Sequence, residues 1–251
     1  MDERRLLRIG HKGADAIQAG NTLASFRAAV EAGVDAIELD VLRPRGDFGP
    51  PRDWTRAVAG PADGSGPLLV AHDWGDAARR APLTLDEGLD AFSSAPLNEV
   101  QIDLDLKIAG REDEMIAALR ERELTDRAMV STMEASSLRY LAEHAPSLRR
   151  GWTIPRVTRD WNSKRWARPL VLAASASFRA RLPWLIERRA PELGAWAVWV
   201  YHPLITRRVV QAAHRAGVDV IAWTVDDAAR IATLRALGVD GICTNDPRLL
   251  E

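Results

Sequence analysis

Cysteine, lysine and long apolar segments are scarce in this 251-residue chain, and each shortage excludes a class of protein. Cys243 is the single cysteine, which excludes an internal disulfide and a cysteine-based metal site. No apolar run approaches the roughly 20 residues of a membrane-spanning helix. The charged start, Met-Asp-Glu-Arg-Arg-Leu-Leu-Arg, is not followed by the apolar stretch of a secretory signal. We therefore expect a cytoplasmic protein.

The overall composition is that of a globular protein with a substantial core. Hydrophobic residues make up 47% of the chain and charged residues 27%, which is incompatible with wholesale disorder. The formal net charge of −1 argues against a nucleic-acid-binding protein. No GxGxxG or P-loop motif is present, which weighs against a doubly wound nucleotide-binding sheet.

Basic residues are unevenly distributed in kind and in position. Only Lys12, Lys107 and Lys164 are lysines, whereas the other 31 basic residues are arginines. Residues 149–190 contain eleven basic and two acidic residues, a net charge of +9, and several tryptophans lie in or beside this segment. Arginine and tryptophan together are typical of a membrane interface, so we expect either a peripheral membrane contact through 149–190 or a covering segment whose charge is neutralised by acids elsewhere.

A helix-to-strand pattern recurs along the chain. Gly33–Ile37, Gly217–Ile221 and Gly238–Ile242 each read Gly-Val-Asp-x-Ile, and each follows a helical pattern. A glycine closing a helix, a short turn and a buried strand explain this pattern. In the first unit, the spacing predicts a helix over 22–32 with Asn21 as its N-cap.

Nine strands are predicted, with helical patterns between most of them. They are 6–10, 36–41, 68–72, 100–106, 128–131, 150–154, 197–201, 220–225 and 241–244. Short apolar strands alternating with helices indicate a parallel α/β fold, and eight strands would close a (β/α)8 barrel, so one of the nine is extra. We expect a single barrel domain over 1–251, with an irregular excursion at 43–66 and a basic, Trp/Arg-rich segment at 154–196 of loop and one or two helices.

Acidic residues alternate with apolar ones on two of the predicted strands. Glu38 and Asp40 share one face of a strand, and Asp103, Asp105 and Lys107 share one face of another. The apolar faces should pack on helices, so the acids should point into the barrel. Carboxylates gathered there repel one another, and a divalent cation relieves that repulsion. Oxygen ligands suit Ca²⁺ or Mg²⁺ rather than zinc.

Each of these signals has a structural alternative. Acids on a strand can be edge charges or salt-bridge partners, and His11 or His72 alone is more often an ordinary core or surface histidine than a catalyst. However, Lys12 and Lys107 both accompany histidines or acids at predicted strand ends, where barrel enzymes place their chemistry. The coincidence favours a site.

In order and number, these motifs resemble the glycerophosphodiester phosphodiesterase family. Seven motifs of the family have counterparts along nearly the whole chain. In order, they are His-Arg-Gly, Glu-Asn-Thr, Gly-x-Asp-x-x-Glu-x-Asp-Val, His-Asp, Glu-x-Lys, Trp-Thr-Val and Gly-Val-Asp-Gly-Ile-x-Thr. These counterparts are His11–Gly13, Gly20–Thr22, Gly33–Val41, His72-Asp73, Asp105–Lys107, Trp223–Val225 and Gly238–Thr244.

The resemblance implies a (β/α)8 barrel of the phospholipase C-like phosphodiesterase type that hydrolyses glycerophosphodiesters to glycerol 3-phosphate and an alcohol. It implies one divalent cation, Ca²⁺ or Mg²⁺, and general acid/base catalysis by two histidines. By position, the metal ligands would be Glu38, Asp40 and Asp105; the acid/base pair His11 and His72; and the substrate-binding residues Lys12, Lys107 and Trp223.

The chain departs from the family pattern at three site positions. Lys12 replaces an arginine and loses its bidentate geometry, Asp105 replaces a longer glutamate, and Gly20 replaces a glutamate. Asp103 could supplement the shorter Asp105 ligand. The elements covering the substrate also differ, because 43–66 precedes His72 whereas the family's insertion usually follows the His-Asp motif.

Other functions therefore stay open at this point. The same barrel could act as a lysophospholipase D or on sphingolipids, or could be a catalytically impaired module that binds phosphoesters. An isomerase or aldolase using Lys107 as a Schiff base is disfavoured, because a lysine beside several acids stays protonated.

Overall fold

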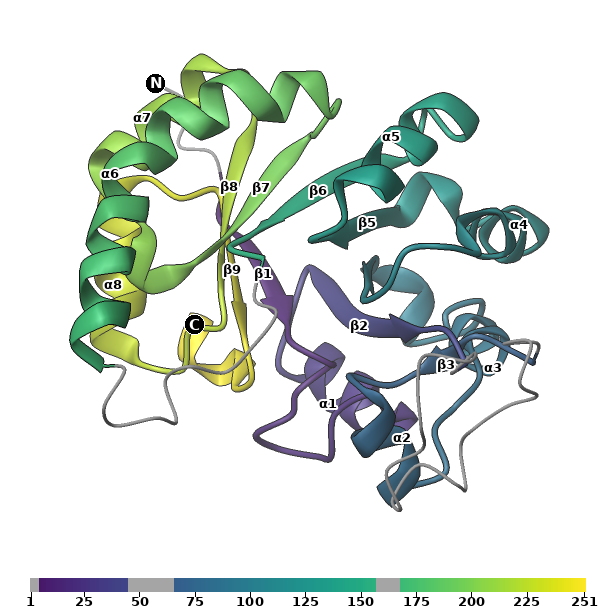
Figure 1. Cartoon of the computed structure of the whole chain (residues 1–251). Coiled ribbons are helices and arrows are strands. Elements are labelled where there is room, and N and C mark those ends of the chain that lie inside the picture. Colours follow the sequence, from purple (N-terminus) through teal and green to yellow (C-terminus); the bar gives the residue numbers. More distant parts are fainter. Residues whose placement is uncertain (1–4, 45–65, 157–167) are drawn as a thin grey trace.

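The computed structural model describes residues 5–44, 66–156 and 168–251, and within them eight parallel strands form a closed barrel (Figure 1). In barrel order they are β1 (Leu7–Gly10), β2 (Ala36–Leu42), β4 (Gln101–Leu106), β5 (Ala128–Thr132), β6 (Arg149–Ile154), β7 (Ala197–Tyr201), β8 (Asp219–Trp223) and β9 (Gly241–Thr244). Strand β1 pairs with both β9 and β2, which closes the sheet. The predicted (β/α)8 fold is confirmed.

The extra strand among the nine predicted ones is the strand at 68–72. It is shortened to β3 (Leu69–Val70), which lies outside the barrel order and pairs antiparallel with the end of β2. His72 was predicted to end this strand, but it lies beyond β3 in irregular backbone. A two-residue strand at the mouth places His72 beside the barrel rather than on its inner wall.

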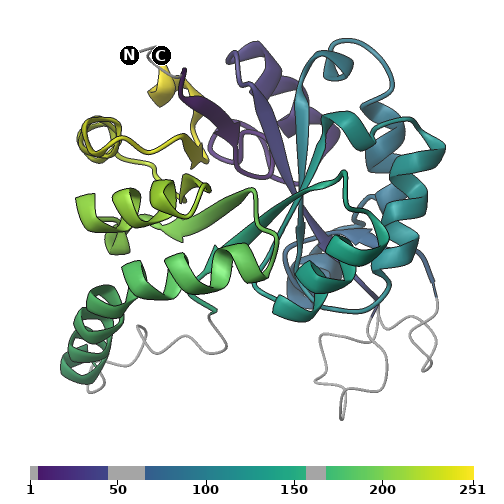
Figure 2. The same cartoon turned by 90° about the horizontal axis from the view of Figure 1, so that it is seen from above.

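Helices surround the sheet on its outer side (Figure 2). They are α1 (Leu23–Glu31), α2 (Trp74–Arg79), α3 (Leu85–Ala91), α4 (Glu112–Glu121), α5 (Ala135–His144), α6 (Arg168–Glu192), α7 (Arg207–Arg215) and α8 (Ala228–Leu237). The outward side chains of the strands form the core with them, as Ile37 and Leu39 of β2 do with Phe26 and Leu89. The opposite faces of the strands, which carry the acids, therefore point into the barrel interior.

The repeated Gly-Val-Asp segments connect helices to strands as predicted. Gly33, Gly217 and Gly238 have φ values of 73°, 72° and 84°, in the left-handed region that glycine adopts without strain. The aspartate that follows has a further use, because Asp35 Oδ2 accepts a hydrogen bond of 2.9 Å from the backbone N–H of Arg8 on the neighbouring strand. Each repeat thus both ends a helix and starts a strand.

Two predictions about irregular segments have different outcomes. Residues 45–65, most of the expected excursion at 43–66, lie outside the described residues, as do 157–167. In the rest of 154–196, one 25-residue helix, α6, precedes β7. None of the helices in the described part of the chain combines the length and apolar character of a membrane span.

Candidate active site

A tight turn after β1 presents His11 and Lys12 at the carboxyl end of the barrel. Gly13 has a φ of 89°, and a Cβ atom there would lie 2.6 Å from the Ser25 hydroxyl, so only glycine fits. The Ser25 hydroxyl accepts from the backbone N–H of Ala14 at 2.8 Å and donates to the Lys12 carbonyl at 2.9 Å. The start of α1 therefore holds the turn that carries both side chains.

The acids on β2 and β4 face one another inside the barrel. The register pairs Glu38 with Asp103 and Asp40 with Asp105, so the four carboxylates form two adjacent layers. Glu38, Asp40 and Asp105 each offer an oxygen, and these oxygens all lie within 4.8 Å of one another. The prediction that the acids point inward is confirmed.

Lys107 is the cation nearest to this carboxylate cluster, which we define as Glu38, Asp40 and Asp105. Its Nζ lies 2.5 Å from Asp40 Oδ1 and also contacts Asp105 Oδ2. Burial alone would lower the pKa of Lys107, but the charges of Asp105 and Asp40 outweigh burial and raise the pKa well above its usual value. Lys107 is therefore a permanent ammonium group, and the Schiff-base alternative loses its support.

One ammonium group does not balance the two buried carboxylates of Glu38 and Asp40 and the partly buried one of Asp105. Burial and the neighbouring charge of Asp40 raise the pKa of Glu38 well above its usual value. Burial also acts on Asp40, but Lys107, His72 and His11 outweigh it and lower the pKa of that carboxyl. Glu38 thus bears the repulsion within the cluster, which a further cation would relieve.

The donor set of the cluster fits a hard divalent cation. Its atoms are all carboxylate oxygens, the ligands that Ca²⁺ and Mg²⁺ prefer. Oxygens that share one Ca²⁺ at about 2.3–2.6 Å can lie up to about 5 Å apart, which their spacing within 4.8 Å satisfies. Asp103 shares the layer of Glu38 but is not part of the cluster; it is fully buried, and its Oδ2 accepts from the Ser131 hydroxyl at 2.7 Å. The expectation that Asp103 could supplement Asp105 is not supported by this geometry.

The two predicted catalytic histidines both act on Asp40 electrostatically. Both imidazoles are close enough to lower its pKa. His11 is largely buried, and burial together with Lys12 lowers its own pKa; its Nε2 lies 4.0 Å from Glu38 Oε2. The side chain of His72 is 51% exposed, and its Nδ1 lies 3.0 Å from Asp73 Oδ2. The site thus pairs a buried imidazole with an exposed one.

A groove of about 250 Å³ joins His72 to the turn after β1. Its lining includes Lys12, Asp15, Gly20 and His72. Asp15 Oδ1 accepts from the backbone N–H of Gly20 at 2.8 Å, and Asp15 Oδ2 lies 3.7 Å from Lys12 Nζ. A Cβ on Gly20 would approach Asp15 Oδ1 to 2.7 Å. The space beside Gly20 is therefore filled by the carboxylate of Asp15, which pairs with Lys12.

Trp223, the predicted glycerol contact, ends β8 at the same end of the barrel. Its ring lies 5.6 Å from that of Tyr201, the last residue of β7. Tyr201 is 39% exposed and is one of two exposed large hydrophobic residues in the described ranges. The pair forms an aromatic wall at the mouth, of which sequence analysis identified only Trp223.

Sequence analysis also misassigned one residue of the site. Asn21 was predicted to cap α1, but the Thr22 side chain does so by accepting from the backbone N–H of Ser25. The fully buried Asn21 instead binds Asp40 twice: Nδ2 donates to Asp40 Oδ2 at 2.6 Å, and Oδ1 accepts from the Asp40 backbone N–H at 3.1 Å. The place of Asn21 in the sequence, next to the capping Thr22, does not indicate that it binds Asp40.

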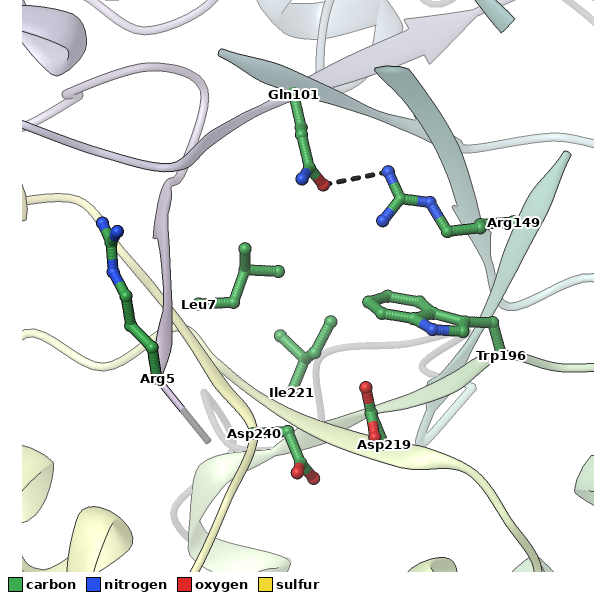
Figure 3. A pocket seen from close by; sticks show the side chains of 8 residues that line it. All are labelled: Arg5, Leu7, Gln101, Arg149, Trp196, Asp219, Ile221 and Asp240. Atoms are coloured by element: carbon green, nitrogen blue, oxygen red, sulfur yellow. Dashed lines mark hydrogen bonds between the residues drawn. The ribbon is translucent and has the colours of Figure 1, made fainter. Parts of the chain in front are cut away.

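The opposite, amino end of the barrel contains a cavity of about 230 Å³ (Figure 3). Leu7 and Ile221 point into it, and the ring of Trp196 lies along one side. Arg149 Nη2 donates to Gln101 Oε1 at 2.9 Å, and its guanidinium lies 5.1 Å from the Trp196 ring centre. None of the residues predicted for the site lines this cavity.

Comparison with known proteins agrees with the geometry. A 58-residue stretch is 45% identical to a glycerophosphodiester phosphodiesterase of Arabidopsis thaliana and covers 23% of this chain and 18% of that protein. A glycerophosphodiester phosphodiesterase of Caldanaerobacter subterraneus subsp. tengcongensis is 26% identical over 265 positions, which cover 98% of this chain and 96% of the relative.

Among solved structures, a phosphodiesterase of Oleispira antarctica in complex with the product sn-glycerol-3-phosphate has the same fold, with a TM-score of 0.63. It is 20% identical, with 96% of this chain and 93% of that chain covered. The model of the glycerophosphoryl diester phosphodiesterase family matches residues 11–44 and 82–249, which include every predicted site residue except His72. The chain therefore belongs to the glycerophosphoryl diester phosphodiesterase family, a family of phosphoric diester hydrolases.

Proposed function

We propose that this protein hydrolyses glycerophosphodiesters to glycerol 3-phosphate and an alcohol, with one divalent cation and two histidines. The observation that carries the proposal is the carboxylate cluster, whose oxygens lie within 4.8 Å of one another and near which His11 and His72 both lie. Family membership supports the reaction class. A structural salt-bridge network needs neither two histidines beside Asp40 nor the surplus of carboxylates.

In this mechanism Glu38, Asp40 and Asp105 would hold Ca²⁺ or Mg²⁺. When bound, the cation neutralises charge on the phosphodiester and so lowers the barrier to attack by a nucleophile. Lys12 and Lys107 bind the other phosphate oxygens, and their positive charge stabilises the transition state. Asn21 keeps the Asp40 carboxylate oriented toward the cluster.

His11 and His72 would exchange protons with the reacting oxygens. One imidazole accepts the proton of the nucleophile and the other donates a proton to the leaving alkoxide, which is the work that histidine does near neutral pH. The exposed groove that joins His72 to Lys12 gives a leaving alcohol a path to solvent. Trp223 supports one side of the substrate by packing against the glycerol.

Phosphorus NMR of metal-stripped protein tests this function. The protein is incubated with a panel of glycerophosphodiesters and lysophospholipids, and Ca²⁺ or Mg²⁺ is added in turn. We expect a phosphomonoester resonance that grows only after metal is added, and the fastest substrate identifies the head group. A folded protein that turns over no substrate with either metal would contradict the proposal, and metal titration would then test a phosphoester-binding role.

A second candidate is the cleavage of lysophospholipids or sphingolipids at a membrane surface. It is favoured by Trp184 of α6, which is 60% exposed in the basic segment and lies 5.5 Å from the guanidinium of Arg188. We propose a peripheral membrane contact through 149–190 in this case. Retention on anionic but not neutral liposomes, and its loss in Trp184→Ala, would support it; equal retention on both would exclude it.

Two further proposals concern the protein as a whole. We propose that residues 1–251 form one barrel domain, since the strands at both ends of the described chain, β1 and β9, pair directly. We also propose a cytoplasmic location, which a single, buried cysteine suits.

A further inference from the structure

The His11 ring nitrogen that points away from the carboxylate cluster is hydrogen-bonded to a chain of two residues, Asn245 and Asp226, which follow other strands of the barrel. His11 Nδ1 lies 2.6 Å from Oδ1 of Asn245, which directly follows β9. The Asn245 amide nitrogen Nδ2 in turn donates to Asp226 Oδ2 at 2.6 Å. Asp226 lies in the segment between β8 and α8, so three neighbouring strands contribute to one chain of contacts.

The chemistry of Asp226 determines the direction of every hydrogen bond in this chain. Its two oxygens accept from Asn245 Nδ2, from the Asn245 backbone N–H at 2.8 Å and from the Thr244 hydroxyl at 3.0 Å. A carboxylate can only accept, so the amide of Asn245 must turn its NH₂ group toward Asp226. Its oxygen must then face His11, and His11 Nδ1 must be the nitrogen that carries the proton.

We propose that Asn245 and Asp226 are positioning residues that hold His11 in the Nδ1–H tautomer and aim its Nε2 lone pair at the reacting atoms. Nε2 is the nitrogen nearest to the carboxylate cluster, 4.0 Å from Glu38 Oε2. The backbone N–H of His11 also donates to the Thr244 carbonyl at 2.8 Å, so the same segment fixes both the backbone and the ring. Neither Asn245 nor Asp226 needs to touch the substrate.

Asp226→Asn is the sharpest test, because it changes a residue that does not contact His11. The one oxygen of the new amide is needed by the Asn245 backbone N–H and the Thr244 hydroxyl, so its NH₂ group would face that of Asn245 unless the Asn245 amide turned over. After that turn, Asn245 Nδ2 would donate to His11 Nδ1 and force the proton onto Nε2. The double variant Asp226→Asn/Asn245→Asp restores every donor and acceptor, because the amide and the carboxylate exchange places.

The tautomer is read directly from two-bond ¹H–¹⁵N spectra of protein with labelled histidine, at a pH where His11 is neutral. The chain has five histidines, and His11→Gln assigns the signal. We expect Nδ1–H in the wild type and in the double variant, and Nε2–H in Asp226→Asn. Asp227→Asn, which changes the neighbouring N-cap residue of α8, is the matched control and should leave the tautomer unchanged.

Kinetics give a second readout, which rests on the proposed phosphodiesterase function. Asp226→Asn and Asn245→Ala should lower kcat by about 10- to 100-fold with little change in KM, and the double variant should recover most of the loss. Nε2–H in the wild-type spectrum, or Nδ1–H retained in Asp226→Asn, overturns the inference whatever the activity. The expected spectra without turnover on any substrate would instead refute the proposed function and leave the tautomer assignment standing.

Discussion

The two ends of this barrel both carry polar side chains but arrange them in different ways. At the amino end, Arg149 bonds to Gln101 and stacks on Trp196, and Asp240 accepts from His214 at 2.8 Å and from a backbone N–H at 2.9 Å. At the carboxyl end, three carboxylates gather around Lys107. A cavity of comparable size lies at each end.

The difference shows that a hollow does not by itself mark the site. Polar groups at the amino end have local partners, which stabilise the barrel without an external ligand. At the carboxyl end, like charges lie close together. Burial and the charge of Asp40 raise the pKa of Glu38, because the protein alone does not neutralise its carboxylate. Such unbalanced groups indicate function, because a ligand is needed to complete them.

The largest effect should come from removing a charge of the cluster. Glu38→Gln should lower kcat/KM by roughly 10³-fold, since it removes a ligand of the cation that stabilises the transition state. Added Ca²⁺ or Mg²⁺ should raise the Tm of the wild type but not of the variant. Calorimetry with and without metal checks this, with the exposed Glu143→Gln of α5 as the control. A variant that keeps wild-type turnover would show that the cluster is structural.

The next effect separates a site histidine from a surface histidine. His11→Ala should lower kcat by about 10²- to 10⁴-fold, the range for loss of a general acid or base. His144→Ala should stay within twofold of wild type, because the His144 ring contacts Tyr140 outside the site: the ring centres are 4.0 Å apart and Nδ1 lies 2.9 Å from the Tyr140 carbonyl. Steady-state kinetics on both variants check the contrast. Equal activities in the two variants would remove His11 from the mechanism.

A smaller effect concerns the pH dependence of stability at Asp103, the neighbour of Glu38 on β4. Burial raises the pKa of Asp103 well above its usual value, although the Ser131 hydrogen bond opposes the rise. The folded protein then binds this proton more tightly than the unfolded chain, so the stabilisation is present below about pH 4 and is lost as pH rises through the folded-state pKa.

Asp103→Asn keeps the shape of the protonated acid and should therefore be more stable than wild type at pH 8. We expect a gain in the free energy of unfolding that is clear at pH 8 and shrinks towards pH 4, because the raised pKa of Asp103 costs the folded protein stability only where the carboxyl is ionised. Urea unfolding at pH 4 and pH 8 in the presence of a chelator checks it, with exposed Asp126→Asn as the control. A gain that is the same at both pH values would contradict the assignment.

The smallest effect is expected at the amino end. Arg149→Met keeps most of the apolar stem but loses the hydrogen bond to Gln101 and the stacking on Trp196, so the free energy of unfolding should fall by about 1 kcal/mol. The kcat/KM should stay within twofold of wild type. A loss of activity larger than the loss of stability would show that the two ends are coupled.

Local patterns in the sequence predicted much of the barrel. The Gly-Val-Asp repeats mark where helices end and strands begin, and all nine predicted strands are found within two or three residues of their predicted ends. Alternation placed Glu38, Asp40 and Asp105 on inward faces, since side chains of a strand alternate with a period of two. Two strands end two residues earlier than predicted, at Trp223 and at Val70 before His72. The second of these ends lies where the chain leaves the barrel and alternation stops.

The residues that sequence analysis did not find are those whose partners lie far away along the chain. Asn21 resembles a helix cap, yet it binds Asp40, and Asn245 contacts His11 across 234 positions. Strand order and register determine these contacts, and neither leaves a local pattern.

The sequence by itself thus determined the barrel and the face on which the acids lie, because periodicity and turn chemistry act over a few residues. The candidate acid/base pair came from the resemblance to the family. Only the tertiary structure decided that Lys107 contacts Asp40, that Asp103 bonds to Ser131 outside the cluster, and which nitrogen of His11 faces Asn245. These features depend on distances between side chains of different strands, which exist only once the sheet has closed.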